Sequence, residues 1–336
     1  MNALKSFFLL FVSLTLVSAC TNSEEGKGAS GIFGSEKVLP PSNGGILDIL
    51  VVADDKVWDG PAGDAFLKHF TAMTYGLPQP EPLYTVRQVG SRDFGDLLKR
   101  SRYLVLLSLG DSTIFTSEND KWARDQLVFY LQAPSEALLR KHILAKNKEI
   151  DALIEQREML RMSKRIAALT HKLYPDFLAE NHIKISIPKD FEISVEKKDL
   201  VIYWRRTKVN DMGIIIYRGP LPQEGAIIGE HLVPLRDSLT KLYVAGAREN
   251  SYMVTEDLIK PQSEPTEISN NFALKTRGLW RSEGDIMGGP FVSYSIYDET
   301  HKQLIYIDAF LLQPDKKKRK TLFELESILN TVEITN

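Results

Sequence analysis

The chain has 336 residues, of which 43% are hydrophobic, and its 42 basic and 44 acidic side chains give a formal net charge of −2. A charge so close to balance argues against a nucleic-acid partner. A chain of this length is expected to form two domains. The single cysteine, Cys20, excludes a disulfide within the chain and a cysteine-based metal site.

The N-terminus is typical of a secretory signal peptide. Lys5 precedes an apolar run from Phe7 to Val17, and small residues lead to Cys20. The run is shorter than the roughly 20 residues that a membrane-spanning helix needs. Val17-Ser18-Ala19-Cys20 resembles the lipobox of bacterial lipoproteins, whose cysteine is acylated (with palmitate among the acyl chains) and becomes the new N-terminus. We expect residues 1–19 to be removed and Cys20 to be lipidated; the alternative is an ordinary signal peptide with an incidental cysteine.

Residues 20–45 have the composition of a flexible tether. They are rich in Gly and Ser and end in Pro40-Pro41-Ser42-Asn43-Gly44-Gly45. A G-x-G-x-x-G sequence occurs at 26–31. A dinucleotide-binding loop needs a strand before this sequence and a helix after it, so we interpret these glycines as part of the tether.

Residues 46–133 predict a small α/β domain. Strand-like and helix-like segments alternate along the chain, which is typical of a layered α/β structure with adjacent strands. The expected strands are Ile46–Ala53, Leu83–Val89 and Tyr103–Leu109, with Leu127–Leu131 as an added edge strand, and the expected helices begin near Pro61 and cover Arg92–Arg100.

Residues 134–180 predict one long helix. No Gly or Pro interrupts the chain from Ser135 to about His171, and Pro175 ends the helix. Met162, Ile166 and Leu169 keep the spacing of one helix face, so the second half is expected to pack firmly. The first half is more polar, and we expect it to project from the body of the protein.

Residues 181–336 predict an antiparallel sheet covered by helices, because strands follow one another with helices at only two points. This order resembles the α/β/α sandwich of PsbP and Mog1-type proteins. The whole chain is therefore expected to be an α+β protein with two domains joined by the long helix. The expected strands are Ile183–Ile187, Leu200–Trp204, Met212–Tyr217, Ser251–Thr255, Ala273–Trp280, Phe291–Tyr297 and Leu304–Leu311, and the helices are Pro234–Ala245 and Lys316–Leu329.

Three aspartates follow the first and third apolar strands of the N-terminal region. Asp54, Asp55 and Asp111 could meet at one sheet edge and hold a divalent metal ion. This arrangement would suit a metal-assisted hydrolase. The alternative is that each aspartate caps a helix or shapes a turn.

Three arginines lie four residues apart on the long helix. Arg157, Arg161 and Arg165 would form a basic stripe that could meet phosphates or an acidic partner. The alternative is a solvated helix face, because acidic residues lie nearby.

The stretch from Trp280 to Phe291 has an unusual composition. Paired glycines permit close approach of another backbone, and Trp and Met offer an adaptable contact surface. We expect either a hairpin turn over the core or a recognition loop. The residues concerned are Trp280, Met287, Gly288, Gly289, Pro290 and Phe291.

Several local motifs together resemble a Bacteroidetes lipoprotein family that is catalogued as a domain of unknown function. Besides the lipobox they are Trp58-x-Gly60-x-x-Gly63-Asp64, Leu77-Pro78-Gln79-x-Glu81-Pro82, Gly278-Leu279-Trp280 and Met287-Gly288-Gly289-Pro290-Phe291. The resemblance implies an envelope lipoprotein and brings no established catalytic residues. Ser23-Glu24-Glu25 is similar to the acidic signal that sends such lipoproteins to the cell surface, and Thr21 is compatible with sorting to the outer membrane.

The sequence therefore predicts a lipoprotein anchored in the outer membrane, on the periplasmic face or the cell surface, that acts as a binding or assembly factor. Its expected partners are the membrane, through the lipid on Cys20, and an envelope protein or glycan. No cofactor is expected. The alternative function is the metal-assisted hydrolase with its acidic site in the N-terminal domain.

Overall fold

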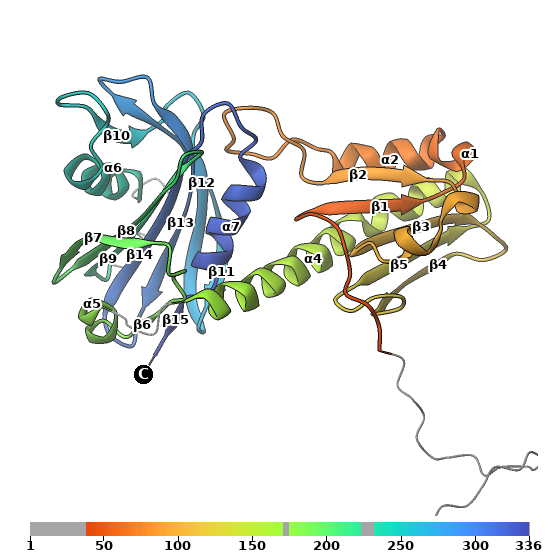
Figure 1. Cartoon of the computed structure of the whole chain (residues 1–336), viewed down its shortest axis with the longest axis horizontal. Coiled ribbons are helices and arrows are strands. Elements are labelled where there is room, and N and C mark those ends of the chain that lie inside the picture. The colour runs from red at the N-terminus through yellow and green to blue at the C-terminus, as the bar shows by residue number, and fades with distance from the viewer. Residues whose placement is uncertain (1–37, 171–174, 223–231, 336) are drawn as a thin grey trace, which may run out of the picture. The chain divides into compact units, whose positions relative to one another are not determined.

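The computed structural model describes residues 38–170, 175–222 and 232–335, and it has the α+β architecture that the sequence predicts (Figure 1). From Leu39 onward the chain forms one compact unit. Its strands form a five-stranded sheet, an eight-stranded sheet and a small two-stranded sheet. Within the described ranges, no helix is both long enough and apolar enough to span a membrane.

The N-terminal sheet has the strand order β2-β1-β3-β5-β4. Its strands are β1 (Asp48–Val52), β2 (Thr85–Val89), β3 (Tyr103–Leu109), β4 (Ile114–Asn119) and β5 (Leu127–Ala133). The first three and β5 run parallel, and β4 pairs antiparallel with β5. The prediction that Leu127–Leu131 forms the edge strand was wrong, because β4 covers that side. The sequence does not predict β4, because nearly all its side chains are exposed and it therefore has no apolar pattern.

Three helices lie between the strands of this sheet, and α2 is the longest of them. They are α1 (Asp55–Trp58), α2 (Pro61–Phe70) and α3 (Asp96–Lys99), with a 3₁₀ turn at Ser91–Asp93. The predicted continuous helix over Arg92–Arg100 is therefore two separate turns, divided at Phe94 and Gly95.

The long helix α4 covers Glu136–Leu169, and the hydroxyl of Ser135 accepts a hydrogen bond from the backbone N–H of Leu138 at 3.4 Å. At 1.5 Å per residue, α4 is about 50 Å long. The expectation that its first half projects was wrong. Leu139, Ile143 and Ile150 are wholly buried, and this half packs against α2 and β5. Its polar residues lie on the outer face, while a narrow apolar stripe suffices for packing.

The C-terminal sheet is antiparallel, with the order β10-β12-β13-β14-β9-β8-β7, and β11 pairs with the first part of the long strand β12. The strands are β7 (Glu192–Lys197), β8 (Leu200–Arg206), β9 (Asp211–Pro220), β10 (Tyr252–Thr255), β11 (Gln262–Ile268), β12 (Asn271–Glu283), β13 (Gly288–Asp298) and β14 (Gln303–Leu312). After the short helix α5 (Asp176–Glu180), β6 (Ile183–Lys184) pairs with β15 (Glu333–Ile334).

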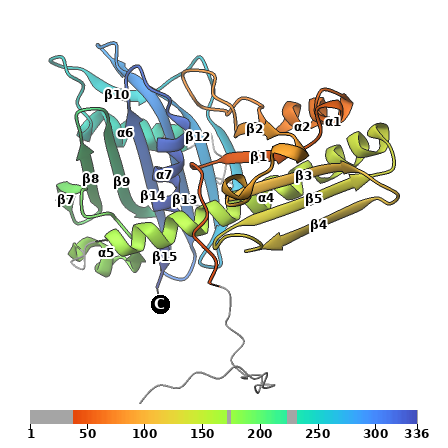
Figure 2. The same cartoon turned by 45° about the vertical axis from the view of Figure 1, so that its right-hand side comes forward.

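Helices cover both faces of this sheet, as the predicted α/β/α sandwich requires. Helix α7 (Arg319–Leu329) lies across β13 and β14 on one face (Figure 2), and α6 (Leu232–Tyr243) packs beside β10 on the other. Side chains of β13 alternate between the two layers: Tyr294 belongs to the core under α7, and Phe291 belongs to the core under α6. The two faces of the sheet are thus lined by separate cores.

The N-terminal region supplies a cap for α7. The carboxylate of Glu81, in the loop before β2, is buried and accepts hydrogen bonds from the backbone N–H groups of Lys318, at 2.5 Å, and Arg319, at 3.1 Å. A carboxylate at a helix N-terminus accepts hydrogen bonds from the free N–H groups there. Its negative charge also interacts favourably with the positive end of the helix dipole.

Candidate functional site

A groove of about 1530 Å³ lies beside the second half of α4. We call it the α4 groove. One wall is α4, and the other sides come from β11, β12 and β13, from the residues after α7, and from the end of β4. Its lining includes Asn119, Glu155, Met159, Leu160, Ser163, Lys164, Ala167, Glu264, Thr266, Lys275, Tyr294 and Glu333.

A cluster of charges adjoins the α4 groove and shares Glu155 and Lys275 with its lining. Glu326 of α7 is wholly buried, and its Oε1 accepts from Nη2 of Arg277 at 2.5 Å and contacts the ammonium group of Lys275. Arg277 also lies 3.8 Å from the carboxylate of Glu155 on α4. The cluster therefore links the sheet to both helices that face it.

Electrostatics keep Glu326 ionised at neutral pH. Burial opposes ionisation, but Arg277 and Lys275 outweigh it and lower the pKa of Glu326 to about 2. Burial likewise opposes the charged form of Arg277, while Glu326 and Glu155 raise its pKa. The second carboxylate oxygen of Glu326 has no hydrogen-bond partner within the described part of the chain. One buried acceptor of this charge cluster is thus left without a hydrogen bond.

Tyr294 contributes a phenol to the same lining. Its side chain is 3% exposed. Burial, and then the charge of Glu326, raises its pKa well above the ordinary value. Tyr294 therefore stays neutral at physiological pH, and its ring provides a rigid apolar surface.

The α4 wall combines apolar surface with charge. Leu160 is 54% exposed, a high fraction for a leucine that faces a groove, and Met159 lies beside it. Lys164 adds a positive charge on the helix, while Glu264 opposes it from β11. Apolar anchors ringed by charges of both signs are typical of a surface that contacts another protein.

The β11 wall is an exposed sheet edge. Among the described strands, β11 pairs only with β12. Pro265 lies in its middle and lacks an N–H, and Glu264 flanks it. Proline and charge on an edge strand are the usual means of preventing a further strand from pairing there.

The structure places the predicted stretch from Trp280 to Phe291 in the β12–β13 hairpin. Trp280 faces Gly289 across the two strands, and both Trp280 and Phe291 are at most 4% exposed, within the core under α6. Met287 packs against the same core, while Ile286 at the tip is 90% exposed. Gly288 and Pro290 are strand residues of β13. These side chains mostly line the interior of the protein.

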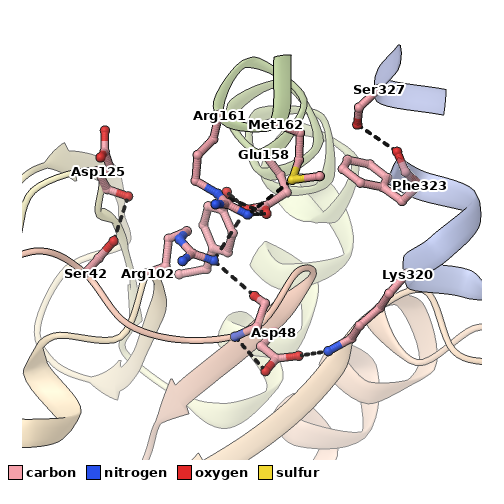
Figure 3. A network of polar contacts seen from close by, with 12 residues as sticks. Ser42, Asp48, Arg102, Asp125, Glu158, Arg161, Met162, Lys320, Phe323 and Ser327 are labelled. Carbon is pink, nitrogen blue, oxygen red and sulfur yellow. Dashed lines mark hydrogen bonds and ion pairs between the residues drawn. The ribbon is translucent and has the colours of Figure 1, made fainter. Parts of the chain in front are cut away.

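The predicted basic stripe does not form one continuous surface. Arg157 donates to Asn119 at 3.0 Å, and Arg161 pairs with the buried carboxylate of Glu158. Arg165 is exposed. Figure 3 shows Arg161, Glu158 and Arg102 gathered at α4, where Tyr103 also donates to Glu158 at 2.6 Å. Two of the three arginines thus satisfy acidic or amide groups of the chain itself.

The three predicted metal ligands are exposed; two lie together at the start of α1, and the third lies in a different turn. Asp54 is the N-cap residue of α1, and Asp55 begins that helix and accepts from Nε2 of Gln88 at 3.2 Å. Asp111 lies in the turn between β3 and β4. No group of three His, Cys, Asp or Glu side chains suited to a metal ion occurs among residues 38–170, 175–222 and 232–335. The predicted lipidation site, Cys20, lies outside the described residues.

Two family models match the chain, and both describe domains of unknown function. One, DUF8532, covers residues 42–167, and the other, DUF4837, covers residues 171–331. Together they take in the five-stranded and the eight-stranded sheet, and the boundary between them falls at the end of α4. The chain thus carries regions that are catalogued as domains of unknown function. No curated protein matches the chain.

Among solved structures, the chain is similar to the Ran-binding protein Mog1p of Saccharomyces cerevisiae, with 11% identity and a TM-score of 0.33, over 47% of this chain and 93% of that one. A mutant of Mog1 gives 12% identity and a TM-score of 0.32 over 50% and 95%. Human STARD10 gives 7% and 0.24 over 49% and 78%. These TM-scores support no conclusion about function.

Proposed function

We propose that this protein is a lipid-anchored binding factor of the bacterial outer membrane, and that it holds a segment of an envelope protein in the α4 groove. The observation that carries the proposal is the exposed apolar surface of α4 around Leu160, set inside a groove that bears charges of both signs. A protein surface that is apolar at its centre and charged at its rim is suited to a protein partner.

The size of the groove favours a polypeptide segment over a small molecule. Pockets for small molecules usually measure about 300–1,000 Å³, and the α4 groove has about 1530 Å³. A helix with one apolar face would place its side chains against Met159 and Leu160, and its charged residues could meet Lys164 and Glu264. The edge strand β11 is less suited to pairing, because Pro265 cannot donate a hydrogen bond there.

The anchor supports this mode of action. Acyl chains on Cys20 would hold the protein at the membrane, and the expected tether, from Cys20 to the start of the compact unit at Leu39, would give the groove room to reach a partner nearby. The lipobox, the motif resemblance to a Bacteroidetes lipoprotein family and the sorting features near Thr21 support this location. Detergent phase partitioning tests the anchor: the wild-type protein should enter the detergent phase, and the Cys20→Ala variant should stay in the aqueous phase.

Site-specific photo-crosslinking in cells tests the groove. A photoreactive residue would replace Leu160 inside the α4 groove or Leu144, which is 43% exposed on α4 but does not line the groove. We expect a discrete protein adduct from position 160 and none from position 144. Leu160→Glu should abolish an adduct formed from a photoreactive residue at Ala167, which lines the same wall. The same adducts at positions 160 and 144, or none from the groove, would contradict the proposal.

A further inference from the structure

A group of arginines lies at the edge of the five-stranded sheet where β3 and β5 begin. Arg102 directly precedes β3, and Arg124 lies shortly before β5. On α4, Arg161 and Arg165 are about one turn apart and therefore share one side of the helix. We call this group the arginine face, and its members are Arg100, Arg102, Arg124, Arg161 and Arg165.

Contacts between the elements hold the arginine face together. Arg102 and Arg161 both approach the buried carboxylate of Glu158, and a single carboxylate cannot neutralise two guanidinium groups. Figure 3 shows these three residues close to Ser42, whose hydroxyl donates to the backbone carbonyl of Asp125 at 3.4 Å. Asp125 also lies near enough to Arg161 to interact with its charge.

Positive charge exceeds negative charge on this surface. Arg124 and Arg165 are exposed, and neither forms an ion pair within residues 38–170, 175–222 and 232–335. The acidic residue Asp120 is already paired with Arg157 at 3.6 Å. Asp125 is exposed but adjoins Arg124, so the surface keeps an excess of positive charge.

The compact unit of the protein begins at the arginine face. The backbone N–H of Arg124 donates to the carbonyl of Pro40 at 2.8 Å, and Nη2 of Arg100 donates to the carbonyl of Pro41 at 3.1 Å. Because the compact unit starts at Leu39, the chain before it is attached beside these arginines.

The opposite edge of the same sheet is acidic. Strands β1, β3 and β5 are parallel, so they all end at that edge. Asp54, Asp55 and Asp111 follow β1 and β3 there and are exposed, and they outnumber the exposed Lys56 beside them. An anionic surface would therefore attract the arginine edge of the sheet and repel the aspartate edge.

An exposed apolar side chain adjoins the arginine face. Leu97 of α3 is 72% exposed, and its backbone carbonyl accepts a hydrogen bond from Nδ2 of Asn43 at 3.5 Å. A leucine beside arginines suits a membrane surface, because the leucine can enter the boundary of the acyl chains while the arginines stay at the phosphates.

We propose that the arginine face lies against the anionic phospholipid headgroups of the bilayer in which Cys20 is anchored. This inference rests on the anchor of the proposed function. The chain from Cys20 to Leu39 can span at most about 70 Å, so this edge of the sheet is within reach of the bilayer. A basic surface of this kind adds to the membrane affinity of acyl chains, and guanidinium groups bind phosphate oxygens in pairs.

Vesicle sedimentation tests the arginine face without the anchor. The protein used is the chain from Thr21 to Asn336, which keeps the whole compact unit and lacks Cys20. It should bind vesicles that contain phosphatidylglycerol and not vesicles of phosphatidylcholine alone. Raising the salt from about 0.1 to 1 M shortens the screening length from about 10 to 3 Å and should release it. The full chain has a formal net charge of −2, so its total charge gives no attraction to an anionic vesicle.

Two neutralising variants and a matched control identify the surface that binds. Arg124→Gln and Arg165→Gln should each weaken binding to the anionic vesicles about fivefold. Arg140→Gln is the control and should leave binding unchanged, because Arg140 is also exposed on α4 but lies about 37 Å along the helix from Arg165. All three variants should keep the urea midpoint of the parent protein, since each changes an exposed side chain.

A fluorescent label tests whether Leu97 meets the bilayer. The chain from Thr21 onward has no cysteine, so Leu97→Cys and Leu144→Cys each give one attachment point for an environment-sensitive dye. On anionic vesicles the emission of the dye at position 97 should shift to the blue. The dye at position 144, where the leucine is 43% exposed on α4, should show no shift.

Failure of this proposal can be told apart from failure of the anchor, because detergent partitioning depends on Cys20 and the vesicle experiment uses a chain without it. Equal binding to the two kinds of vesicle would overturn the proposal, as would equal losses from Arg140→Gln and Arg165→Gln. A dye at position 97 that shows no shift would mean that another face meets the bilayer. No binding to the anionic vesicles would also overturn the proposal and would favour an acidic protein as the partner of this surface.

Discussion

Arg277 of β12 and Glu326 of α7 meet at 2.5 Å, and the carboxylate of Glu326 has no exposed surface. Lys275, which is two residues before Arg277 on β12, contacts the same oxygen. The three side chains form one electrostatic unit, because each buried charge is stable only while its partners remain. This unit lies where α7, the sheet and the α4 groove come together.

Glu326→Gln should destabilise the protein strongly. Glutamine keeps the size of the side chain but removes the negative charge, which leaves Arg277 and Lys275 without their buried counter-ion. Breaking a buried ion pair on one side costs about 3–5 kcal/mol in the free energy of unfolding. Urea denaturation of the full chain measures this loss. The matched control is Glu333→Gln, since Glu333 pairs with Lys184 at the surface and such pairs contribute about 0–1 kcal/mol. Equal losses in the two variants would contradict the prediction.

The same carboxylate predicts how stability depends on pH. The pKa of Glu326 falls from 4.5 to about 2 on folding. A lowered folded-state pKa stabilises the protein fully above the unfolded pKa, and the contribution is lost as the pH falls from 4.5 toward 2. The difference corresponds to about 3 kcal/mol.

Urea midpoints measured at a series of pH values check this window. The urea midpoint of the wild-type protein should fall as the pH is lowered below 4.5. The urea midpoint of Glu326→Gln should fall less over the same pH range. Parallel curves for the two proteins would show that other carboxylates govern the acid sensitivity.

The first half of α4 should contribute to the core, contrary to its polar composition. Ile150 is wholly buried in the N-terminal core, whereas Leu144 on the same half is 43% exposed. Ile150→Ala should lower the free energy of unfolding by about 2–5 kcal/mol, because it removes buried methyl groups and leaves a cavity. Leu144→Ala should cost less than about 1 kcal/mol. A small effect at position 150 would mean that this half of the helix does project.

For helix α4, the local sequence predicts that a helix forms but not how it packs. Its start could be predicted because serine is a favoured N-cap residue, and its length because no Gly or Pro lies between Ser135 and Pro175; the helix ends at Leu169, before the predicted end at Pro175. Its packing could not, since the buried residues Leu139 and Ile143 form a stripe among many charges. Whether such a stripe meets a surface depends on α2 and β5, which are distant in sequence.

The strands that the sequence did not reveal are edge strands or lie beside an edge. β4, β7 and β11 expose most of their side chains, and β11 contains Pro265. Sequence periodicity reports burial on one face. Strands that are exposed on both faces are stabilised mainly by backbone pairing, so they leave no such pattern.

The α4 groove could not be predicted from the sequence, for a different reason. Its main side chains, Glu155, Lys275 and Tyr294, belong to three elements that only the folded chain brings together. One local signal was present: Glu326 falls four residues after Leu322, on the buried face of α7. A charge in an apolar helix stripe indicates a buried partner, although it does not identify that partner.

Gly63 of α2 lies close to the end of α1. A methyl group on Gly63 would lie 1.8 Å from the carbonyl oxygen of Trp58, a backbone atom that cannot rotate away. Alanine favours helices over glycine by about 1 kcal/mol, so helix propensity alone predicts that Gly63→Ala stabilises α2. The clash opposes this gain, and overpacking costs typically about 1–3 kcal/mol or more.

We therefore expect Gly63→Ala to lower the urea midpoint. The control is Gly95→Ala, because a methyl group there meets nothing within 4 Å and the residue precedes α3 with a negative φ of −82°. That variant should lower the free energy of unfolding by no more than about 1 kcal/mol, because Gly95 is the N-cap residue of α3 and alanine is less favourable there. If Gly63→Ala were as stable as Gly95→Ala, the short turn between α1 and α2 would have to open, and the Trp58-x-Gly60-x-x-Gly63 spacing would not be needed for packing.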